Sequence, residues 1–261
     1  MIEDVTPSAS LHNNGVVRSS LSSPSIQVKI KGFLKSSLVD WDGYVTAVVF
    51  LPRCNLRCPM CHNHEIVLTP ESYPDVPGKE IERYLMENND FIDGVVITGG
   101  EPTIYGDLPD FCRWLKSLGS LIKLDTNGTH PEMIKHLIDE KLIDYIAMDV
   151  KAPLHEDVYN VASGCAVDVS SIRRSINVIM SSYVEYEFRT TVVPSFLTAE
   201  DVVKIAETVS GAKRFVLQQF NPKNTLDPKL REVEPYSSEE LENIANRCKP
   251  FVSKVKVRAK K

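Results

Sequence analysis

The chain lacks the features that would place it in a membrane, outside the cell or on nucleic acid. None of its apolar runs reaches the length of a membrane-spanning helix. Residues 1–25 contain no basic segment followed by an apolar one, as an export signal would require. The formal charge of -5 is mildly negative, whereas a nucleic-acid partner calls for clustered Lys and Arg. We therefore expect a cytoplasmic protein that has neither a membrane nor nucleic acid as a partner.

Cysteines are few, 6 in 261 residues, which excludes a small scaffold held by disulfides. Three of them are isolated in the sequence: Cys112, Cys165 and Cys248. The other three, Cys54, Cys58 and Cys61, stand in CNLRCPMCHN at the spacing C-x3-C-x2-C. Cytosolic thiols stay reduced, so cysteines this close together indicate metal binding or catalysis.

A regular alternation of apolar β-branched runs and helical patterns begins near residue 44. The expected strands are 44–51, 94–100, 121–128, 144–153, 185–194 and 214–220. Helices are expected at 79–88, 107–119, from Pro131, from a cap at Ser170, at 198–210, and after a capping box of Ser237 and Glu240. This pattern predicts an α/β fold with a parallel sheet. Six units fall short of the eight of a closed barrel, so a partial barrel or a doubly wound sheet fits.

The domain organisation follows from this alternation. Residues 1–27 are rich in Ser and Asn and read as a mobile leader. Residues 28–225 form the main domain, and residues 226–261 add a last helix and a basic tail packed on it. We interpret residues 254–261 as a short solvated end.

Polar residues follow the predicted strands where each strand ends. Ligands bind at the carboxyl ends of strands in such folds, so these residues predict a site on one rim. The residues are the three cysteines, then Gly99, Gly100 and Glu101, then Asp125, Thr126 and Asn127, then Asp149, Lys151 and Arg189.

The cysteine triplet alone leaves two interpretations open. A structural zinc ion usually has four ligands, and His62 or His64 could complete a Cys3His site. Three thiolates can also hold a [4Fe–4S] cluster with one iron left open for a ligand. The position after the first strand, and the lack of a second cysteine pair, favour the cluster.

The triplet followed by Gly99-Gly100-Glu101-Pro102 after the second strand resembles the radical S-adenosylmethionine (SAM) superfamily. The resemblance implies a partial (β/α)6 TIM-like barrel. It implies that Cys54, Cys58 and Cys61 hold a [4Fe–4S] cluster whose fourth iron SAM chelates. Reductive cleavage of SAM would then yield a 5′-deoxyadenosyl radical, which abstracts a hydrogen atom from the substrate.

Within that superfamily, residues 28–225 resemble activases of glycyl radical enzymes. The matching segments are SLVD, His62-Asn63 after the last cysteine, LDTNG, DVK and a strand with Arg and VVP. Residues 64–98 contain no cysteine, so a ferredoxin-like insert found in some activases is absent. The implied partners are an anaerobic (class III) ribonucleotide reductase and an electron donor of the flavodoxin or ferredoxin type.

The resemblance also implies roles for single residues. Met60 replaces a usual aromatic residue and would pack against adenine, and the glycines would let the backbone approach the ligand. Carbonyls of Gly99 and Gly100, with the carboxylate of Glu101, would accept hydrogen bonds from the SAM ammonium. Asp125 and Asp149 would surround the amino end of SAM and would hold a monovalent cation together with Thr126. Lys151 and Arg189 would meet the SAM carboxylate. His62 and Asn63 are further expected cofactor contacts.

Other interpretations are available for the chain and for several of these residues. The chain could be a radical SAM enzyme for a small molecule, such as a 7-carboxy-7-deazaguanine synthase. It could also be a Cys3His zinc module that binds proteins. Asp125 could form an Asx-type turn, and Lys151 and Arg189 could form surface ion pairs.

Overall fold

The computed structural model describes residues 28–259. The predicted leader, residues 1–27, and the last two lysines lie outside the described residues. The described strands form one eight-stranded sheet in which the spatial order follows the chain order. Their bounds are β1 Gly32–Ser37, β2 Thr46–Leu51, β3 Gly94–Gly99, β4 Leu121–Thr126, β5 Tyr145–Asp149, β6 Glu185–Val192, β7 Phe215–Gln219 and β8 Val255–Arg258.

The sheet is a barrel that does not close. Strands β2 to β8 run parallel, and β1 is antiparallel to β2. Among the described residues, β1 and β8 are the two ends of the strand order and do not pair with each other. The predicted α/β fold and partial barrel are therefore confirmed. The six predicted strands correspond to β2–β7, and β1 and β8 extend the sheet beyond the prediction.

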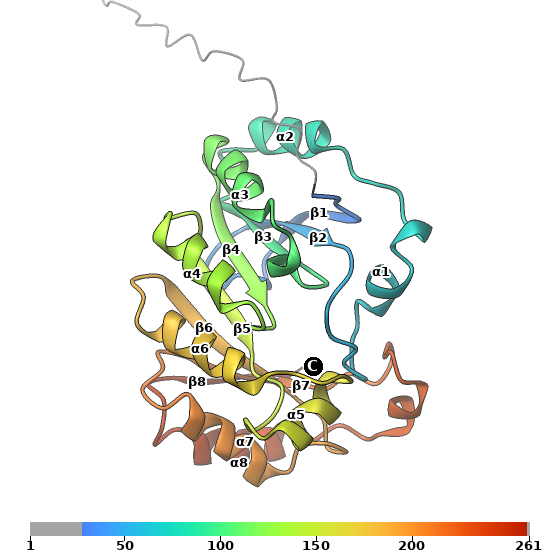
Figure 1. Cartoon of the computed structure of the whole chain (residues 1–261), viewed down its shortest axis with the longest axis vertical. Coiled ribbons are helices and arrows are strands. Elements are labelled where there is room, and N and C mark those ends of the chain that lie inside the picture. Colours follow the sequence, from blue (N-terminus) through green and yellow to red (C-terminus); the bar gives the residue numbers. More distant parts are fainter. Residues whose placement is uncertain (1–27, 260–261) are drawn as a thin grey trace, which may run out of the picture.

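Helices alternate with the strands and lie along the outer side of the sheet (Figure 1). They are α1 His64–Leu68, α2 Gly78–Glu87, α3 Leu108–Ser117, α4 Pro131–Asp139, α5 Glu156–Ser163, α6 Val169–Met180, α7 Ala199–Thr208 and α8 Ser238–Cys248. The capping box of Ser237 and Glu240 is present at α8. The predicted cap Ser170 is wrong, because Asp168 accepts the Ser170 N–H at 2.9 Å and caps α6 instead.

Both faces of the parallel strands are buried, which explains their nearly continuous apolar runs. Successive strand residues point to opposite faces. Ala47, Val49 and Leu51 of β2 belong to the large core that includes the helices. Val48, between them, belongs to a small cluster inside the barrel that also contains Trp41. The barrel interior below the rim is therefore filled by these side chains, and the polar residues of the predicted site lie on the rim.

The basic C-terminal end is not the solvated tail that we expected. Val255–Arg258 forms β8 and pairs with β7. Arg258 binds the buried Glu187 with both guanidinium nitrogens, at 2.9 and 3.1 Å. Lys256 Nζ lies 2.7 Å from Asp42 Oδ2 in the connection between β1 and β2. These ion pairs form because residues 255–258 are a strand. In the sequence, two valines that alternate with two basic residues did not indicate a strand.

None of the helices in the described part of the chain combines the length and the apolar character that crossing a membrane requires.

Candidate active site at the rim of the barrel

The three cysteines lie on one loop between β2 and α1, at the carboxyl end of the sheet. Each thiol is half-buried, and the Cys61 N–H donates to the Cys58 carbonyl at 3.0 Å, which forms a tight turn. The Cys54 sulfur accepts the Leu56 N–H at 3.3 Å. Iron–sulfur clusters are held by cysteine thiolates, and three thiols on one loop fit a cluster with one iron free for another ligand.

Burial dominates the acidity of these thiols. It raises the pKa of Cys54 to about 12, with a further contribution from the charge of Glu101. It raises the pKa of Cys58 to about 11, although the nearby Lys151 ammonium opposes the increase. The metal-free thiols are therefore protonated at neutral pH. Binding of a metal must release these protons, because the thiolate is the ligand.

The glycines after β3 pack against the cysteine loop. A Cβ on Gly100 would lie 1.6 Å from the Arg53 carbonyl oxygen, and one on Gly99 would lie 2.4 Å from the Leu51 carbonyl oxygen. The Gly100 N–H donates to Leu51 O at 2.8 Å. We expected these glycines to make room for a ligand. The structure shows that they make room for the backbone at the end of β2 and of the cysteine loop, and the approach of a ligand stays a prediction.

The carboxylate of Glu101 joins two loops of the rim by hydrogen bonds. The side chain is buried and accepts hydrogen bonds from the backbone and hydroxyl of Thr103, from the Thr126 hydroxyl at 2.7 Å and from the Asn127 N–H at 2.6 Å. Burial raises the pKa of Glu101, and the hydrogen bonds oppose that rise. An ionised carboxylate has about four acceptor positions, so these bonds use most of its capacity. The contact between Glu101 and SAM stays a prediction.

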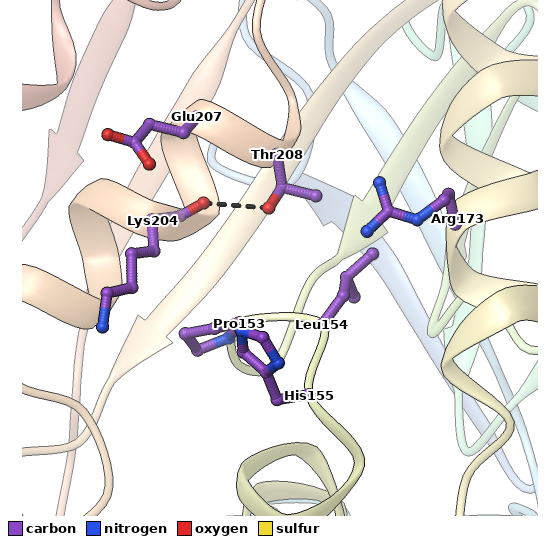
Figure 2. Close-up of a pocket in the computed structure, with 7 residues that line it drawn as sticks. All are labelled: Pro153, Leu154, His155, Arg173, Lys204, Glu207 and Thr208. Carbon is purple, nitrogen blue, oxygen red and sulfur yellow. Dashed lines mark hydrogen bonds between the residues drawn. The ribbon is translucent and has the colours of Figure 1, made fainter.

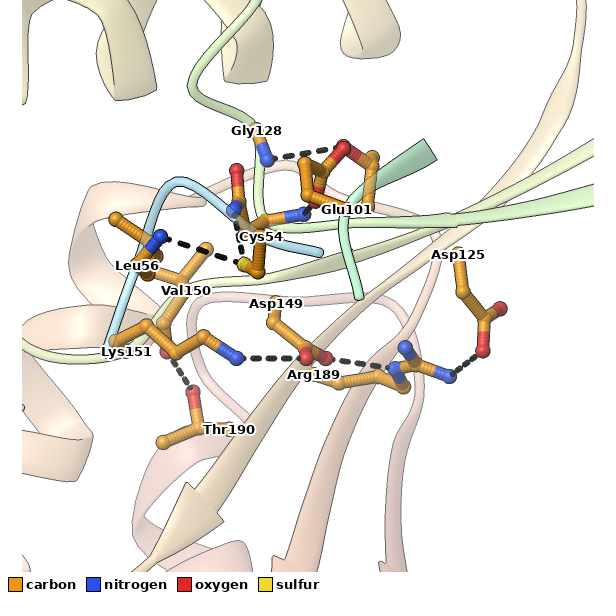
Figure 3. A network of polar contacts seen from close by, with 12 residues as sticks. Cys54, Leu56, Glu101, Asp125, Gly128, Asp149, Val150, Lys151, Arg189 and Thr190 are labelled. Atoms are coloured by element: carbon orange, nitrogen blue, oxygen red, sulfur yellow. Dashed lines mark hydrogen bonds and ion pairs between the residues drawn. The ribbon is translucent and has the colours of Figure 1, made fainter. Parts of the chain in front are cut away.

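A chain of ion pairs crosses the rim from β5 to β4 (Figure 3). Lys151 Nζ lies 2.8 Å from Asp149, and Arg189 Nε lies 2.8 Å from the other oxygen of Asp149. Arg189 Nη1 continues to Asp125 at 3.1 Å, and the buried Lys123 lies 3.4 Å from the second oxygen of Asp125. The Arg189 side chain is only 10% exposed. The alternative of surface ion pairs is therefore wrong.

The ion pairs keep these groups charged at neutral pH. Burial alone would raise the pKa of Asp149, but Arg189 and Lys151 outweigh it and hold that pKa well below its usual range. Asp125 has an oxygen, Oδ1, that is buried and accepts no hydrogen bond, although Lys123 lies within ion-pair distance. A buried carboxylate oxygen that accepts no hydrogen bond can take up a further ammonium group, such as the amino group of SAM.

The three residues predicted to hold a monovalent cation do not converge. The Arg189 guanidinium bridges Asp125 and Asp149, and the Thr126 hydroxyl donates to Glu101. Within residues 28–259, no three His, Cys, Asp or Glu side chains converge as ligands of a single ion. A monovalent cation held by Asp125, Asp149 and Thr126 stays a prediction. A cluster makes a different demand, because each of its three cysteines binds a separate iron.

The two histidines after the triplet contact the segment that follows β7. His62 Nε2 lies 3.0 Å from Asn221 O, and His64 Nε2 lies 2.9 Å from Asn224 Oδ1. The histidine ligand required by a Cys3His zinc site is therefore engaged elsewhere. Asn63 ties the cysteine loop to the Gly99 carbonyl at 2.8 Å. The contacts of His62 and Asn63 with the cofactor stay predictions.

Residues 221–227 form a clasp on the cysteine loop. Asn224 donates its amide to His62 O at 3.0 Å while its Oδ1 faces His64. The Asp227 N–H donates to Pro59 O at 2.9 Å. The clasp joins segments that lie about 160 residues apart in the sequence. No sequence motif predicted this contact.

We expect Asn224→Ala to loosen the cysteine loop, because it removes two of the clasp's hydrogen bonds. Losing an outer-shell partner typically costs about tenfold or more in metal affinity. Iron release from the reconstituted protein to a chelator should therefore be about tenfold faster. Asn221→Ala is the matched control, because it removes one bond within the clasp, to the Lys223 N–H at 3.2 Å, and keeps the contact of His62 with the Asn221 backbone carbonyl. Equal release rates in the two variants would contradict this role.

Three further features compare with the sequence predictions: Met60, the Asx-type turn and Lys123. Met60 is buried and belongs to the main hydrophobic core, and its contact with adenine remains a prediction. The Asx-type turn is formed by Asn127, whose Oδ1 accepts the Thr129 N–H at 3.0 Å, and not by Asp125. The sequence reasoning missed Lys123. Its position two residues before Asp125 in a strand was the available signal, because residues i and i+2 share a face.

The described surface includes two hollows of interest. One, of about 250 Å³, lies beside the cysteine loop. Its lining residues are Lys31, Gly32, Phe50, His62, Asn63, Glu65, Ile66 and Tyr73. The other, of about 320 Å³, is lined by residues from α6, α7 and the loop before α5. Figure 2 shows that the Arg173 guanidinium points toward Thr208 and Leu154, while the Lys204 amine points away, so its cations do not converge.

Comparison with known proteins supplies the context for this geometry. The family model described as the radical SAM superfamily matches residues 48–209. A Methanocaldococcus jannaschii protein named "Putative glycyl-radical enzyme activating enzyme MJ1227" is 35% identical over 88% of this chain and 95% of its own length. A 7-carboxy-7-deazaguanine synthase of Neisseria meningitidis is 33% identical over 43% of this chain and 47% of its own length.

Solved structures confirm the fold. Streptococcus suis SuiB bound to its precursor peptide SuiA superposes with a TM-score of 0.63 at 15% sequence identity. The match covers 81% of this chain and 48% of SuiB, so this chain corresponds to about half of that protein.

Proposed function

The chain belongs to the radical SAM superfamily, and from that premise we propose that it installs a glycyl radical on a partner enzyme. The likeness to the M. jannaschii protein, which extends over nearly the whole of both chains, supports this proposal. The proposed partner is an anaerobic ribonucleotide reductase. The proposed electron donor is of the flavodoxin or ferredoxin type, and the proposed compartment is the cytoplasm.

The observation that carries the proposal is the meeting of the cysteine loop and the ion-pair chain on one rim. Cys54, Cys58 and Cys61 would hold a [4Fe–4S] cluster. The charge of Lys151 opposes the rise in the pKa of the Cys58 thiol, and Figure 3 draws Cys54 and the ion-pair chain in one close-up, which supports a shared site. When bound, the cluster and SAM supply a radical that abstracts a hydrogen atom from the substrate.

The residues of the chain would bind and orient the methionyl end of SAM. Asp125 would offer the oxygen that accepts no hydrogen bond, together with Asp149, to the ammonium group. Lys151 and Arg189 offer cationic donors to the carboxylate, Lys151 as a point charge and Arg189 as a fork. The present ion pairs would exchange partners when SAM binds. Carbonyls at Gly99 and Gly100, and the side chain of Met60, remain proposed further contacts.

The open flank of the barrel suits a polypeptide substrate. The hollow beside the cysteine loop lies between β1 and α1, where the sheet has an end strand. The barrel interior below the rim is filled by Trp41 and Tyr145. A glycine on a flexible segment of a partner could therefore approach the rim from the side, without entering the barrel.

The test is the formation of a glycyl radical on the partner. The reconstituted protein, SAM, a reductant and a class III ribonucleotide reductase should together give a glycyl doublet in the EPR spectrum. A reductase with its radical glycine replaced by alanine is the control and should give no doublet. A silent spectrum with a partner that a known activase can activate would contradict the proposal.

A small-molecule substrate is the second candidate, favoured by the likeness to the N. meningitidis 7-carboxy-7-deazaguanine synthase over part of the chain. That candidate predicts that a pterin substrate binds to the SAM-loaded protein. Isothermal titration with the pterin would decide between them, since only the second candidate requires a site for it.

A further inference from the structure

Asn127 points its amide nitrogen at a cysteine of the proposed cluster. Its side chain is 6% exposed and follows the end of β4. Nδ2 lies 3.7 Å from Cys54 Sγ and 2.9 Å from Asn55 Oδ1. With the Leu56 N–H at 3.3 Å, the Cys54 sulfur faces two N–H donors.

The orientation of this amide follows from its other contacts. The Asn127 Oδ1 atom accepts the backbone N–H of Thr129 at 3.0 Å and the Thr129 hydroxyl at 2.7 Å. A backbone N–H can only donate, so the atom that faces it must be the oxygen. The nitrogen therefore faces the sulfur. Asn55 supports the arrangement by donating its own amide to the Thr129 hydroxyl at 2.8 Å.

The backbone of Asn127 is fixed independently of its side chain. Its N–H donates to the buried Glu101 carboxylate at 2.6 Å. Glu101 is in turn tied to Thr103 and Thr126. A substitution at position 127 retains this backbone bond, so it changes the donor to Cys54 while leaving the rim in place.

We propose that Asn127 is a positioning residue that raises the reduction potential of the cluster through its hydrogen bond to Cys54, an inference that rests on the proposed function. Hydrogen bonds to the sulfurs are among the determinants of cluster potentials. An N–H dipole aimed at sulfur stabilises negative charge, and the reduced cluster carries one more electron than the oxidised one. The step is a one-electron transfer from the flavodoxin or ferredoxin-type donor, in which no bond forms or breaks.

The test is an EPR-monitored redox titration of the full-length, reconstituted protein without SAM. Asn127→Ala should move the midpoint to a more negative potential. We expect the equilibrium constant for reduction to fall threefold to tenfold, which corresponds to ~28 to 59 mV for one electron. Asn127→Asp keeps the shape and an oxygen for Thr129 but replaces the donor with a charged acceptor, so its shift should be larger.

Asn55→Ala is the matched control. It removes the Asn55 contacts with Asn127 and Thr129, while the Thr129 N–H still holds Asn127 Oδ1 and so keeps Nδ2 facing Cys54. Its shift should be less than half of that in Asn127→Ala. Equal shifts in the two variants, or an unchanged midpoint in Asn127→Ala, would overturn the proposal. So would failure of both Asn127 variants to hold a cluster, since Asn127 would then be structural. A wild-type protein that takes up no cluster would contradict the proposed function instead.

Discussion

Gly100→Ala is expected to remove nearly all the bound iron–sulfur cluster from the reconstituted protein. The added Cβ would lie 1.6 Å from the Arg53 carbonyl oxygen, and backbone atoms on both sides of this contact cannot rotate away. The cysteine loop must therefore shift relative to β3. The hydrogen bonds from the Gly100 N–H to Leu51 O and from the Glu101 N–H to Arg53 O are then lost. We expect a loss of about 4 kcal/mol or more in the free energy of unfolding.

Gly106→Ala is the matched control for this prediction. It lies six residues further along the chain, has no atom within 4 Å of the added Cβ, and is not among the glycines with positive φ. Its iron content and urea midpoint should match those of the wild type. Normal iron content in Gly100→Ala would contradict the prediction, because cluster binding would then not require close packing of Gly100 against the cysteine loop.

Replacing Arg189 is expected to give the second large effect, this time on SAM binding and on stability together. Arg189→Met retains the length of the side chain but leaves Asp125 and Asp149 without the cation that bridges them. Breaking a buried ion pair on one side typically costs about 3–5 kcal/mol. Lys123 and Lys151 still face the two carboxylates, so we expect the lower end of that range.

The dependence on pH gives this prediction a sign. Arg189 and Lys151 lower the pKa of Asp149, so their stabilisation is present above the usual aspartate pKa of about 3.9 and is lost as the pH falls through the lower, folded value. Without Arg189 the pKa of Asp149 should rise. The destabilisation measured by urea unfolding should then be larger at pH 7 than at pH 3, where the stabilisation by Arg189 is already partly lost in the wild type.

Arg173→Met is the control, because Arg173 is an exposed residue of α6. It should change stability by no more than about 0.5 kcal/mol. SAM affinity should fall in Arg189→Met and stay unchanged in Arg173→Met. If both variants bind SAM normally, Arg189 has only a structural role.

The parts of the fold that could be predicted from the sequence are those buried on both faces. Strands such as TAVVFL in β2 are apolar throughout because helices cover one side and the barrel interior the other. Strand β1, GFLKSS, was missed since it lies at the end of the sheet and its central residues are exposed. Strand β8, VKVR, was missed because its basic residues are paired with Asp42 and Glu187, far away in the sequence.

The site follows the same division. Its residues could be placed on one rim because carboxyl ends of parallel strands meet there. Their partners could not be predicted, since each contact joins distant segments. Glu101 is engaged by Thr126 and Asn127, and His64 by Asn224. The packing role of the Gly-Gly-Glu turn against the cysteine loop could therefore not be predicted, and its role in ligand binding stays a prediction.

The most direct test of the central claim is the cleavage of SAM. The protein should be reconstituted with iron and sulfide without oxygen, reduced, and mixed with SAM, and 5′-deoxyadenosine should be measured by mass spectrometry. Cys58→Ala is the control, because it removes one of the three thiols proposed to hold the cluster. We expect 5′-deoxyadenosine from the wild type and none above background from Cys58→Ala. Equal amounts from both proteins, or none from a wild-type protein that binds stoichiometric zinc, would contradict the account.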